Sequence, residues 1–237
     1  MPNNYFQFKQ FTIRQEHAAM KVGTDGVLLG AWAHVEQARR ILDIGTGTGL
    51  IALILAQRSA AQIDALDIDP TACKEAQQNA EASPWSKRIT IINHAVQEYA
   101  ATCAHRYDLI VSNPPFFQQS LKAATAERTQ ARHTDNLPVE ELFASVVQLL
   151  AAGGAFEVII PAESLAQYKQ LAAQHKLYNN QLLWVKPTPD KAPKRVLCSF
   201  SFTQSSLQEV ALVIESGGRH VYSEEYQKLT RDFYLGF

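Results

Sequence analysis

The chain has 237 residues, of which 46% are hydrophobic and 19% are charged, and its formal net charge is −1. This composition excludes a disordered polymer and fits a globular protein with a substantial core. The nearly neutral charge excludes binding of nucleic acid by overall attraction alone, so any such contact depends on local basic patches.

The cysteines and the apolar segments point to a reducing compartment. Cys73, Cys103 and Cys198 are widely spaced and odd in number, and they match neither a disulfide framework nor a metal-ligand spacing. The first residues do not read as a signal peptide, and the longest apolar run, residues 50–56, is too short to cross a bilayer. We therefore expect a cytoplasmic protein with no membrane segment and no metal.

Up to residue 112, strand and helix patterns alternate, after residues 1–38, which show no clear strand pattern. Residues 50–56 are apolar on every side, which indicates a buried helix, and Pro70 suits the first turn of another helix. The predicted order is strand 40–44, helix 50–56, strand 63–68, helix 70–82, strand 89–92 and strand 107–112. Such alternation is typical of a parallel sheet that carries helices on both faces.

The second half continues this alternation and ends in strands. A helix opens at Pro138, and we expect Gly153–Gly154 to end it. The elements that follow are strand 155–160, a helix with Leu165, Tyr168 and Ala172 on one face, and strands 182–185, 196–202 and 209–214. The short connections between the last three strands predict antiparallel pairing. The sequence therefore predicts a doubly wound α/β fold with five parallel strands and an antiparallel end.

A glycine loop follows the first of these strands. Residues 43–49 read Asp-Ile-Gly-Thr-Gly-Thr-Gly and lead into the buried helix. Gly45, Gly47 and Gly49 let the backbone approach a ligand where a Cβ would clash, and the helix N-terminus offers free N–H groups. Asp43 is placed to hold the ammonium group of a cationic sulfonium ligand with an amino-acid tail, directly or through water.

An acidic residue follows the second strand. Asp67 comes 18 residues after Gly49, where a carboxylate can accept hydrogen bonds from both hydroxyls of a ribose. A nicotinamide dinucleotide site uses the same logic, but in its G-x-G-x-x-G spacing the third glycine falls where Leu50 stands here. A pyrophosphate also has no need of Asp43. The alternative is that the glycine loop is a tight turn that binds no ligand.

The segment Asn113-Pro114-Pro115-Phe116 directly follows the fourth strand. Ligands bind at this carboxyl end of open α/β sheets. An aromatic amine attacks a methyl sulfonium poorly unless two acceptors hold its two protons and draw the nitrogen toward sp³ geometry. The Asn113 side-chain oxygen and the Pro114 carbonyl are the candidates, Pro114 and Pro115 fix the backbone, and Phe116 can stack on a base. The alternative is an ordinary proline-rich turn.

Together these motifs resemble the class I methyltransferases that depend on S-adenosyl-L-methionine, over residues 10–203. Within that class the sequence is similar to the bacterial tRNA(Val) adenine-N6-methyltransferase family, which modifies the adenine next to the anticodon. The closer match lies in residues 19–32, which contain Lys-Val-Gly-Thr-Asp-Gly, in residues 113–117, and in residues 187–197.

The resemblance implies one methyltransferase domain over residues 1–237. Its parts would be a cofactor-covering segment at 1–38, a core at 39–203 and a C-terminal extension at 204–237. It also implies a mostly parallel, Rossmann-like sheet of seven strands with an antiparallel terminal strand. Such a family would bind S-adenosyl-L-methionine through Lys21, Gly23, Thr24, Asp25, Asp43, Gly45, Gly47, Gly49, Asp67, Ile68, Ala95, Val96 and Asn113. The chain departs from the pattern at Ala95, where an acidic residue often meets the cofactor adenine.

Two basic segments are candidates for contact with a tRNA partner. Residues 118–137 form a long polar loop that carries Lys122, Arg128, Arg132 and His133, and residues 186–195 carry Lys186, Lys191, Lys194 and Arg195. Lysine and arginine side chains of this kind can follow phosphates. A solvated surface with no RNA contact is an equal alternative for any one of them.

Other functions remain open at this level. The acceptor of the methyl group can instead be guanine in ribosomal RNA, adenine in DNA or a glutamine amide of a protein, because related Asn-Pro-Pro enzymes serve all three. A module that binds the cofactor without turnover is a third reading, and a dehydrogenase is a fourth.

Overall fold

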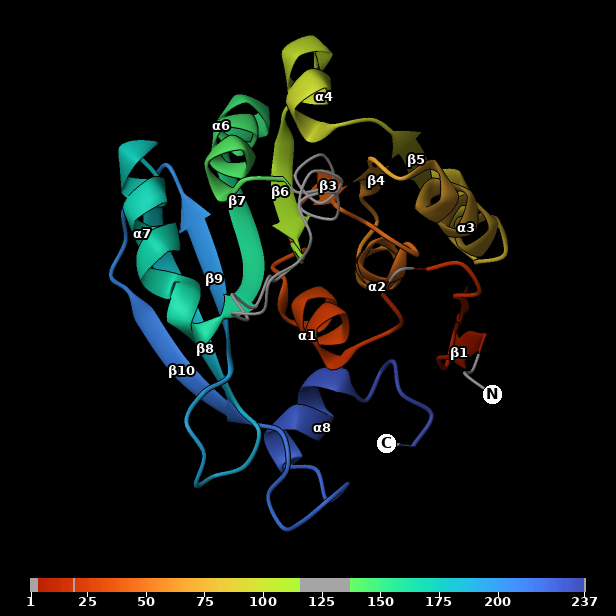
Figure 1. Cartoon of the computed structure of the whole chain (residues 1–237), viewed down its shortest axis with the longest axis vertical. Helices are drawn as coiled ribbons and strands as arrows, with labels where there is room; N and C mark the ends of the chain where they lie inside the picture. Colours follow the sequence, from red (N-terminus) through yellow and green to blue (C-terminus); the bar gives the residue numbers. More distant parts are fainter. Residues whose placement is uncertain (1–3, 19, 116–136, 237) are drawn as a thin grey trace, which may run out of the picture.

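The computed structural model describes residues 4–18, 20–115 and 137–236 and places an eight-stranded sheet between two groups of helices (Figure 1). The strand order across this sheet is β10-β8-β9-β7-β6-β3-β4-β5. Its strands are β3 (Arg40–Ile44), β4 (Gln62–Asp67), β5 (Ile89–Asn93), β6 (Tyr107–Ser112), β7 (Leu150–Pro161), β8 (Tyr178–Lys186), β9 (Arg195–Ser201) and β10 (Gln208–Val213). A separate hairpin joins β1 (Tyr5–Gln7) to β2 (Thr12–Arg14).

The helices of the described residues alternate with the strands up to β8. They are α1 (Thr24–Trp32), α2 (Leu50–Arg58), α3 (Pro70–Glu81), α4 (Val96–Thr102), α6 (Val139–Leu149), α7 (Leu165–Gln174) and α8 (Glu224–Thr230), with single 3₁₀ turns η1 (Ser86–Arg88) and η2 (Ala162–Ser164). Helices α4 and α8 are not among the elements that the sequence predicts. Helix α3 starts where expected, because Pro70 occupies its first turn and the Asp69 side chain accepts a hydrogen bond from Thr71 N.

Two hydrophobic cores lie on the two faces of the sheet. Side chains alternate between them with a period of two, so that along β6 Leu109 and Val111 enter one core and Ile110 enters the other. Helices α1, α2 and α8 cover the first face, and α4, α6 and α7 cover the second (Figure 1). The doubly wound α/β fold is therefore confirmed.

The strand directions extend and partly correct the expected layout. Strands β5, β4, β3, β6 and β7 are parallel, and β9 runs antiparallel to both β7 and β8. The sheet has eight strands rather than seven, because β10 is added at the edge. Strand β10 pairs with β8 in parallel, not antiparallel as expected. The chain reverses once from β8 to β9 and again from β9 to β10, so β10 regains the direction of β8.

Gly153 and Gly154 lie within a strand and do not end a helix. Helix α6 ends at Leu149, and the glycines lie inside β7, beside a shift of register in its pairing with β6. A Cβ on Gly154 would lie 2.8 Å from the carbonyl oxygen of Tyr107 and 2.9 Å from that of Asp108. The glycine therefore permits a close approach of two backbones.

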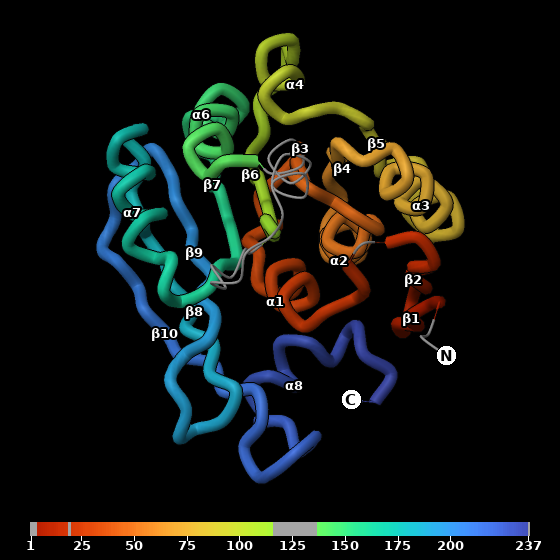
Figure 2. Tube along the Cα trace, viewed as in Figure 1, coloured from red at the N-terminus to blue at the C-terminus, as the bar shows by residue number. Residues whose placement is uncertain are grey.

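The N-terminal part of the chain is more regular than its sequence indicates. Besides the β1–β2 hairpin it contains helix α1, whose Gly26 and Gly30 pack directly against Leu50 and Ile54 of α2. The hairpin also meets the C-terminal part of the chain, since Lys9 N donates to Phe233 O at 2.8 Å. Figure 2 shows the two ends of the chain on the same side of the molecule.

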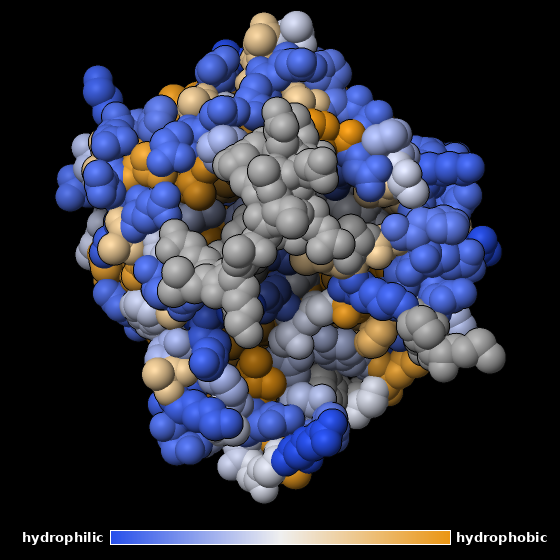
Figure 3. All heavy atoms as spheres, in the orientation of Figure 1, coloured by the Kyte–Doolittle hydropathy of each residue, from blue (hydrophilic) through white to orange (hydrophobic). Residues whose placement is uncertain are grey.

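The described surface is largely polar. On the face shown in Figure 3, hydrophobic side chains form small separate patches among hydrophilic ones. No helix in residues 4–18, 20–115 and 137–236 is long and apolar enough to cross a bilayer. Within the same residues, no group of three or more histidine, cysteine or acidic side chains is arranged to hold a metal ion.

Candidate active site

The predicted cofactor and catalytic residues meet at one edge of the sheet. The register pairs Ile44 with Leu66 on one side and with Ser112 on the other. The residues that follow, Gly45, Asp67 and Asn113, therefore emerge next to one another at the carboxyl ends of β3, β4 and β6. This is the edge where ligands bind in open α/β sheets.

The glycine loop has the backbone conformation that its sequence requires. Gly45, Gly47 and Gly49 all have positive φ, at 74°, 55° and 82°, which side chains with a Cβ rarely adopt. At Gly45 and Gly47 nothing lies within 4 Å of where a Cβ would be, so the loop faces open space among the described residues. Gly45 N and Thr46 N both donate to Leu66 O, which fixes the loop against β4.

Asp43 is fully buried beneath this loop. Its Oδ2 accepts a hydrogen bond of 2.7 Å from the Thr46 hydroxyl, while its Oδ1 has no partner among the described residues. Burial raises the pKa of Asp43 to about 7; the Thr46 hydroxyl and the backbone N–H of Ala52 oppose this shift, and the charge of Asp67 adds to it. A buried carboxylate oxygen without a partner is costly unless a cation or a donor meets it.

Asp67 holds the loop and the neighbouring turn. Its Oδ2 accepts from Gly47 N at 2.8 Å, and its Oδ1 accepts from Asp69 N at 3.0 Å. Beside it, Ile68 is 56% exposed, which is unusual for an isoleucine at the end of a buried strand and gives an apolar surface for a flat ring. The predicted pair Asp67 and Ile68 thus offers acceptors next to an apolar contact.

Asn113 presents a second orphaned oxygen at the same edge. The Asn113 Oδ1 is buried and has no hydrogen-bond partner among the described residues. Pro114 is buried and Pro115 exposed, directly after β6. Ser112 anchors the strand end by donating from its hydroxyl to Ile44 O at 3.0 Å. Phe116, the fourth residue of the predicted catalytic motif, lies outside the described residues.

The cofactor-covering segment reaches the same region through α1. Gly23 precedes the first turn of α1, Thr24 and Asp25 lie in that turn, and Gly26 packs on Leu50, the first residue of α2 after the glycine loop. Lys21 is exposed just before them. The structure therefore brings this segment to the start of α2, directly after the glycine loop.

On the other side, the end of β5 supplies Ala95 and Val96. Ala95 precedes the first turn of α4 and Val96 is buried within it. The link to the rest of the site is Asn93, whose Nδ2 donates to Asp67 O and Ile68 O, both at 3.0 Å. The two predicted residues thus lie one strand beyond Asp67.

The candidate RNA-binding residues differ in exposure and in hydrogen-bond partners. Lys191 and Lys194 are exposed in the loop between β8 and β9. Arg195 is different, because its Nε donates to Asp25 Oδ2 at 2.8 Å and its Nη1 to Lys194 O at 3.1 Å. Lys122, Arg128, Arg132 and His133 lie outside the described residues.

Sequence reasoning missed three residues that support the site. They are Thr46, which bonds to Asp43; Asn93, which joins the ends of β4 and β5; and Gln15, whose Oε1 accepts from Val22 N at 2.8 Å. Asn93 could have been found, since it is a polar residue directly after a strand, as Asp67 is. Gln15 gives no such signal, because it lies in a segment without a clear pattern.

The arrangement fits S-adenosyl-L-methionine. The Asp43 Oδ1 atom, which has no partner among the described residues, can accept a hydrogen bond from the ligand's ammonium group, and the open side of the glycine loop leaves room for the ligand's amino-acid tail. Asp67 and Ile68 suit the ribose and the adenine, respectively. In a low-dielectric setting, a cation beside Asp43 would also favour the ionised carboxylate.

Comparison with known proteins decides the family. The family model described as the methyltransferase small domain matches residues 18–181. The chain belongs to this family. It is 49% identical over 236 residues to a Bacteroides fragilis protein named tRNA1(Val) (adenine(37)-N6)-methyltransferase, with 99% of each chain covered. A Trichodesmium erythraeum protein of the same name is 47% identical over 240 residues, with 100% of each chain covered.

Solved structures agree on the fold. A predicted O-methyltransferase from Agrobacterium tumefaciens has a TM-score of 0.70 at 18% identity, covering 88% of this chain and 96% of that one. A ribosomal protein L11 methylase from Lactobacillus delbrueckii has a TM-score of 0.56 at 18% identity, covering 80% and 84%. The predicted enzyme class is confirmed: the chain is a methyltransferase, and S-adenosyl-L-methionine is its cofactor.

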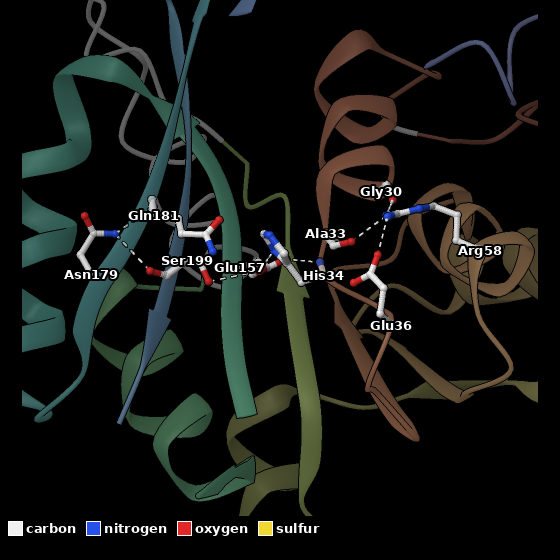
Figure 4. Close-up of polar contacts among 9 residues, drawn as sticks. All are labelled: Gly30, Ala33, His34, Glu36, Arg58, Glu157, Asn179, Gln181 and Ser199. Carbon is white, nitrogen blue, oxygen red and sulfur yellow. Dashed lines mark hydrogen bonds and ion pairs between the residues drawn. The ribbon is translucent and has the colours of Figure 1, made fainter. Parts of the chain in front are cut away.

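A separate buried carboxylate lies within the sheet. Glu157 of β7 has no exposed surface and accepts hydrogen bonds from His34 N, His34 Nδ1 and Ser199 Oγ (Figure 4). Nearby, Arg58 Nη1 donates to Gly30 O and Ala33 O, which satisfies carbonyls at the end of α1. These contacts hold α1 to the sheet and to α2.

Proposed function

We propose that this methyltransferase modifies the exocyclic N6 amino group of an adenine in tRNA, next to the anticodon of tRNA(Val). The observation that carries the proposal is Asn113 Oδ1, a buried acceptor without a partner, beside the glycine loop. The near full-length similarity to proteins named for this reaction supports the choice of acceptor. The free thiols of Cys73, Cys103 and Cys198 are compatible with a cytoplasmic enzyme.

When bound, S-adenosyl-L-methionine supplies a methyl group on a sulfonium, which an amine can attack without a protein nucleophile. The protein's task is to orient that amine. Asn113 Oδ1 and the Pro114 carbonyl accept the two protons of the 6-amino group, which turns its lone pair away from the ring. The rigid backbone of Pro114 and Pro115 keeps these acceptors in place.

The binding residues divide along the same edge. We assign the cofactor's amino-acid tail to Asp43 and the glycine loop, its ribose to Asp67 and its adenine to the surface of Ile68, Ala95 and Val96. The segment with Lys21, Gly23, Thr24 and Asp25 covers it from the side of α1. Exposed Lys191 and Lys194 are assigned to RNA phosphates, together with Arg128 and Arg132 of the segment outside the described residues.

Methyl transfer from labelled S-adenosyl-L-methionine to unmodified tRNA, followed by nucleoside analysis, tests the proposal. N6-methyladenosine in tRNA(Val) is the expected product. Label in guanosine, or label only with ribosomal RNA, DNA or protein, would keep the mechanism and overturn the acceptor. Cofactor binding without transfer to any acceptor would overturn the catalytic assignment of Asn113.

A further inference from the structure

A pocket opens at the end of β8, beside the start of α1 and at some distance from the glycine loop and Asp67. Its volume is about 300 Å³, and it lies between the start of α1, the ends of β8 and β10, and the start of β9. Its apolar wall consists of Val185, Pro187 and Ile214, and its polar wall of Thr24, Asp25, Lys194 and Arg195. This volume is at the small end of the range for ligand pockets, which suits one nucleoside rather than a length of RNA.

The pocket faces the same side of the molecule as Asn113. Strands β6, β7, β8 and β10 run in the same direction, because β9 reverses once between β7 and β8. Their carboxyl ends therefore share one edge. Strands β7 and β9 separate β6 from β8, so the pocket lies three strand spacings, about 14 Å, from the strand that carries Asn113. It also lies on the side of β3 opposite β4, away from the ribose and adenine contacts.

The charges of the pocket suit a phosphate. Lys194 is exposed, and its Nζ has no acceptor within the described residues. Arg195 and Asp25 neutralise each other across the polar wall through their 2.8 Å ion pair. The remaining formal charge of the wall is that of the Lys194 ammonium, next to an apolar surface on which a base can lie.

We infer that this pocket is a subsite for one unstacked nucleotide of the RNA substrate, close to the target adenine but not adjacent to it. The inference rests on the proposed function. Stacked nucleotides advance only about 3.4 Å each, so a stacked run needs about four steps to cover the separation of β6 and β8, and a nucleotide nearer to the target must leave the stack to reach the pocket. Single-stranded loops are commonly recognised through bases that are splayed out in this way.

Abasic scanning of an anticodon stem-loop RNA tests the subsite. Single nucleotides around the target adenine are replaced by abasic ones, and KM for the RNA is measured with the wild-type protein, Ile214→Ala and Lys194→Ala. We expect one non-adjacent position whose abasic form raises the wild-type KM about tenfold. For Ile214→Ala, KM for the intact RNA should already be raised, and removal of the base at that position should not raise it further.

Matched controls separate this role from a structural one. Lys87 is equally exposed but precedes β5, at the opposite edge of the sheet, so Lys87→Ala should leave KM for the RNA unchanged. Ile214 packs in part against the core of the first face, so Ile214→Ala should lower Tm, while its cofactor affinity should match the wild type. If Ile214→Ala and Lys194→Ala respond to every abasic RNA as the wild type does, the subsite is wrong while the proposed function stands. If the wild type methylates neither this stem-loop nor whole tRNA, both are wrong.

Discussion

The His34 ring nitrogen Nδ1 lies 2.7 Å from Oε1 of Glu157, and the Glu157 side chain has no exposed surface. One partner of this pair is half-exposed on the loop after α1, and the other lies in the middle of β7. The hydrogen bond to Glu157 raises the pKa of His34; burial and Arg58 oppose the shift, and Glu36 adds to it. The pair therefore links protonation at the surface to the packing of the sheet.

His34 should make folding stability depend on pH. Because the folded-state pKa is raised, its contribution is fully present below the unfolded value of about 6.5 and is lost as pH rises through the folded value. We expect His34→Gln to lower Tm at pH 6 more than at pH 9. An exposed histidine, His105, gives the control variant His105→Gln. Equal losses of Tm at both pH values for His34→Gln would contradict the linkage.

Asn113→Ala should reduce kcat by about 10² or more, the order found when one group that stabilises the transition state is lost. Affinity for S-adenosyl-L-methionine, measured by calorimetry, should hardly change. A loss of cofactor affinity as large as the loss of kcat would show that Asn113 binds the cofactor rather than the acceptor amine.

Cofactor binding should strengthen as the buried carboxylate of Asp43 ionises. Its pKa is raised to about 7, chiefly by burial, so the charged form that attracts a cationic ligand dominates above that value. If only this form binds, the dissociation constant should be roughly tenfold lower at pH 8 than at pH 6. Asp43→Asn should weaken binding and remove this pH dependence. Exposed Asp232→Asn is the control, and an identical profile in Asp43→Asn would reject the assignment.

Arg195 should act through Asp25 rather than through RNA phosphates. Both groups are partly exposed, so their ion pair contributes at most about 1 kcal/mol, or roughly fivefold in affinity. Arg195→Ala is expected to raise the dissociation constant of the cofactor by up to that factor, and Asp25→Asn by a similar one. Lys191→Ala, by contrast, should reduce the salt slope of RNA binding by about one. A similar reduction in Arg195→Ala would restore its role as a phosphate contact.

Gly154→Ala should destabilise the fold by about 1–3 kcal/mol, because its Cβ would collide with two backbone oxygens of the β6 segment that cannot move away. Thermal unfolding measures the loss. The adjacent Gly153 provides the control, since nothing lies within 4 Å of a Cβ there, and Gly153→Ala should be nearly neutral. Equal Tm values for the two variants would refute the close approach.

The parallel half of the sheet could be predicted because its local signals agree. Short apolar runs typical of strands alternate with segments that have helical periodicity. Polar residues such as Asp67 and Asn113 directly follow strands, and in a parallel sheet the ends of these strands lie at one edge. The hairpin escaped prediction because β1 and β2 have only three residues each, too few for a pattern. Gly153–Gly154 was misread because glycine after a helix and glycine in a close strand look alike in sequence.

Local sequence patterns do not predict contacts between segments that lie far apart in the chain. Asp25 and Arg195 are 170 residues apart, and each looks like a surface charge in its own segment. The direction of β10 also depends on where β9 is inserted, which no local signal fixes. The sequence therefore predicts that the ends of β3, β4 and β6 meet, whereas the lining of the pocket at the end of β8 emerged only from the fold.

The contact of the N-terminal hairpin with Phe233 also sets an order of events during synthesis. Lys9 reaches the ribosome exit early, but its partners Phe233 and Arg231 follow more than 200 residues later. The hairpin and the segment after it can dock on α3 earlier, because Arg14 N donates to Asn79 Oδ1 and Glu16 N donates to Glu75 Oε1. Their contacts with Phe233 and Arg231 form only at the end of synthesis. The contacts that close the N-terminal part of the chain against its C-terminal part are thus the last to form, after the central sheet.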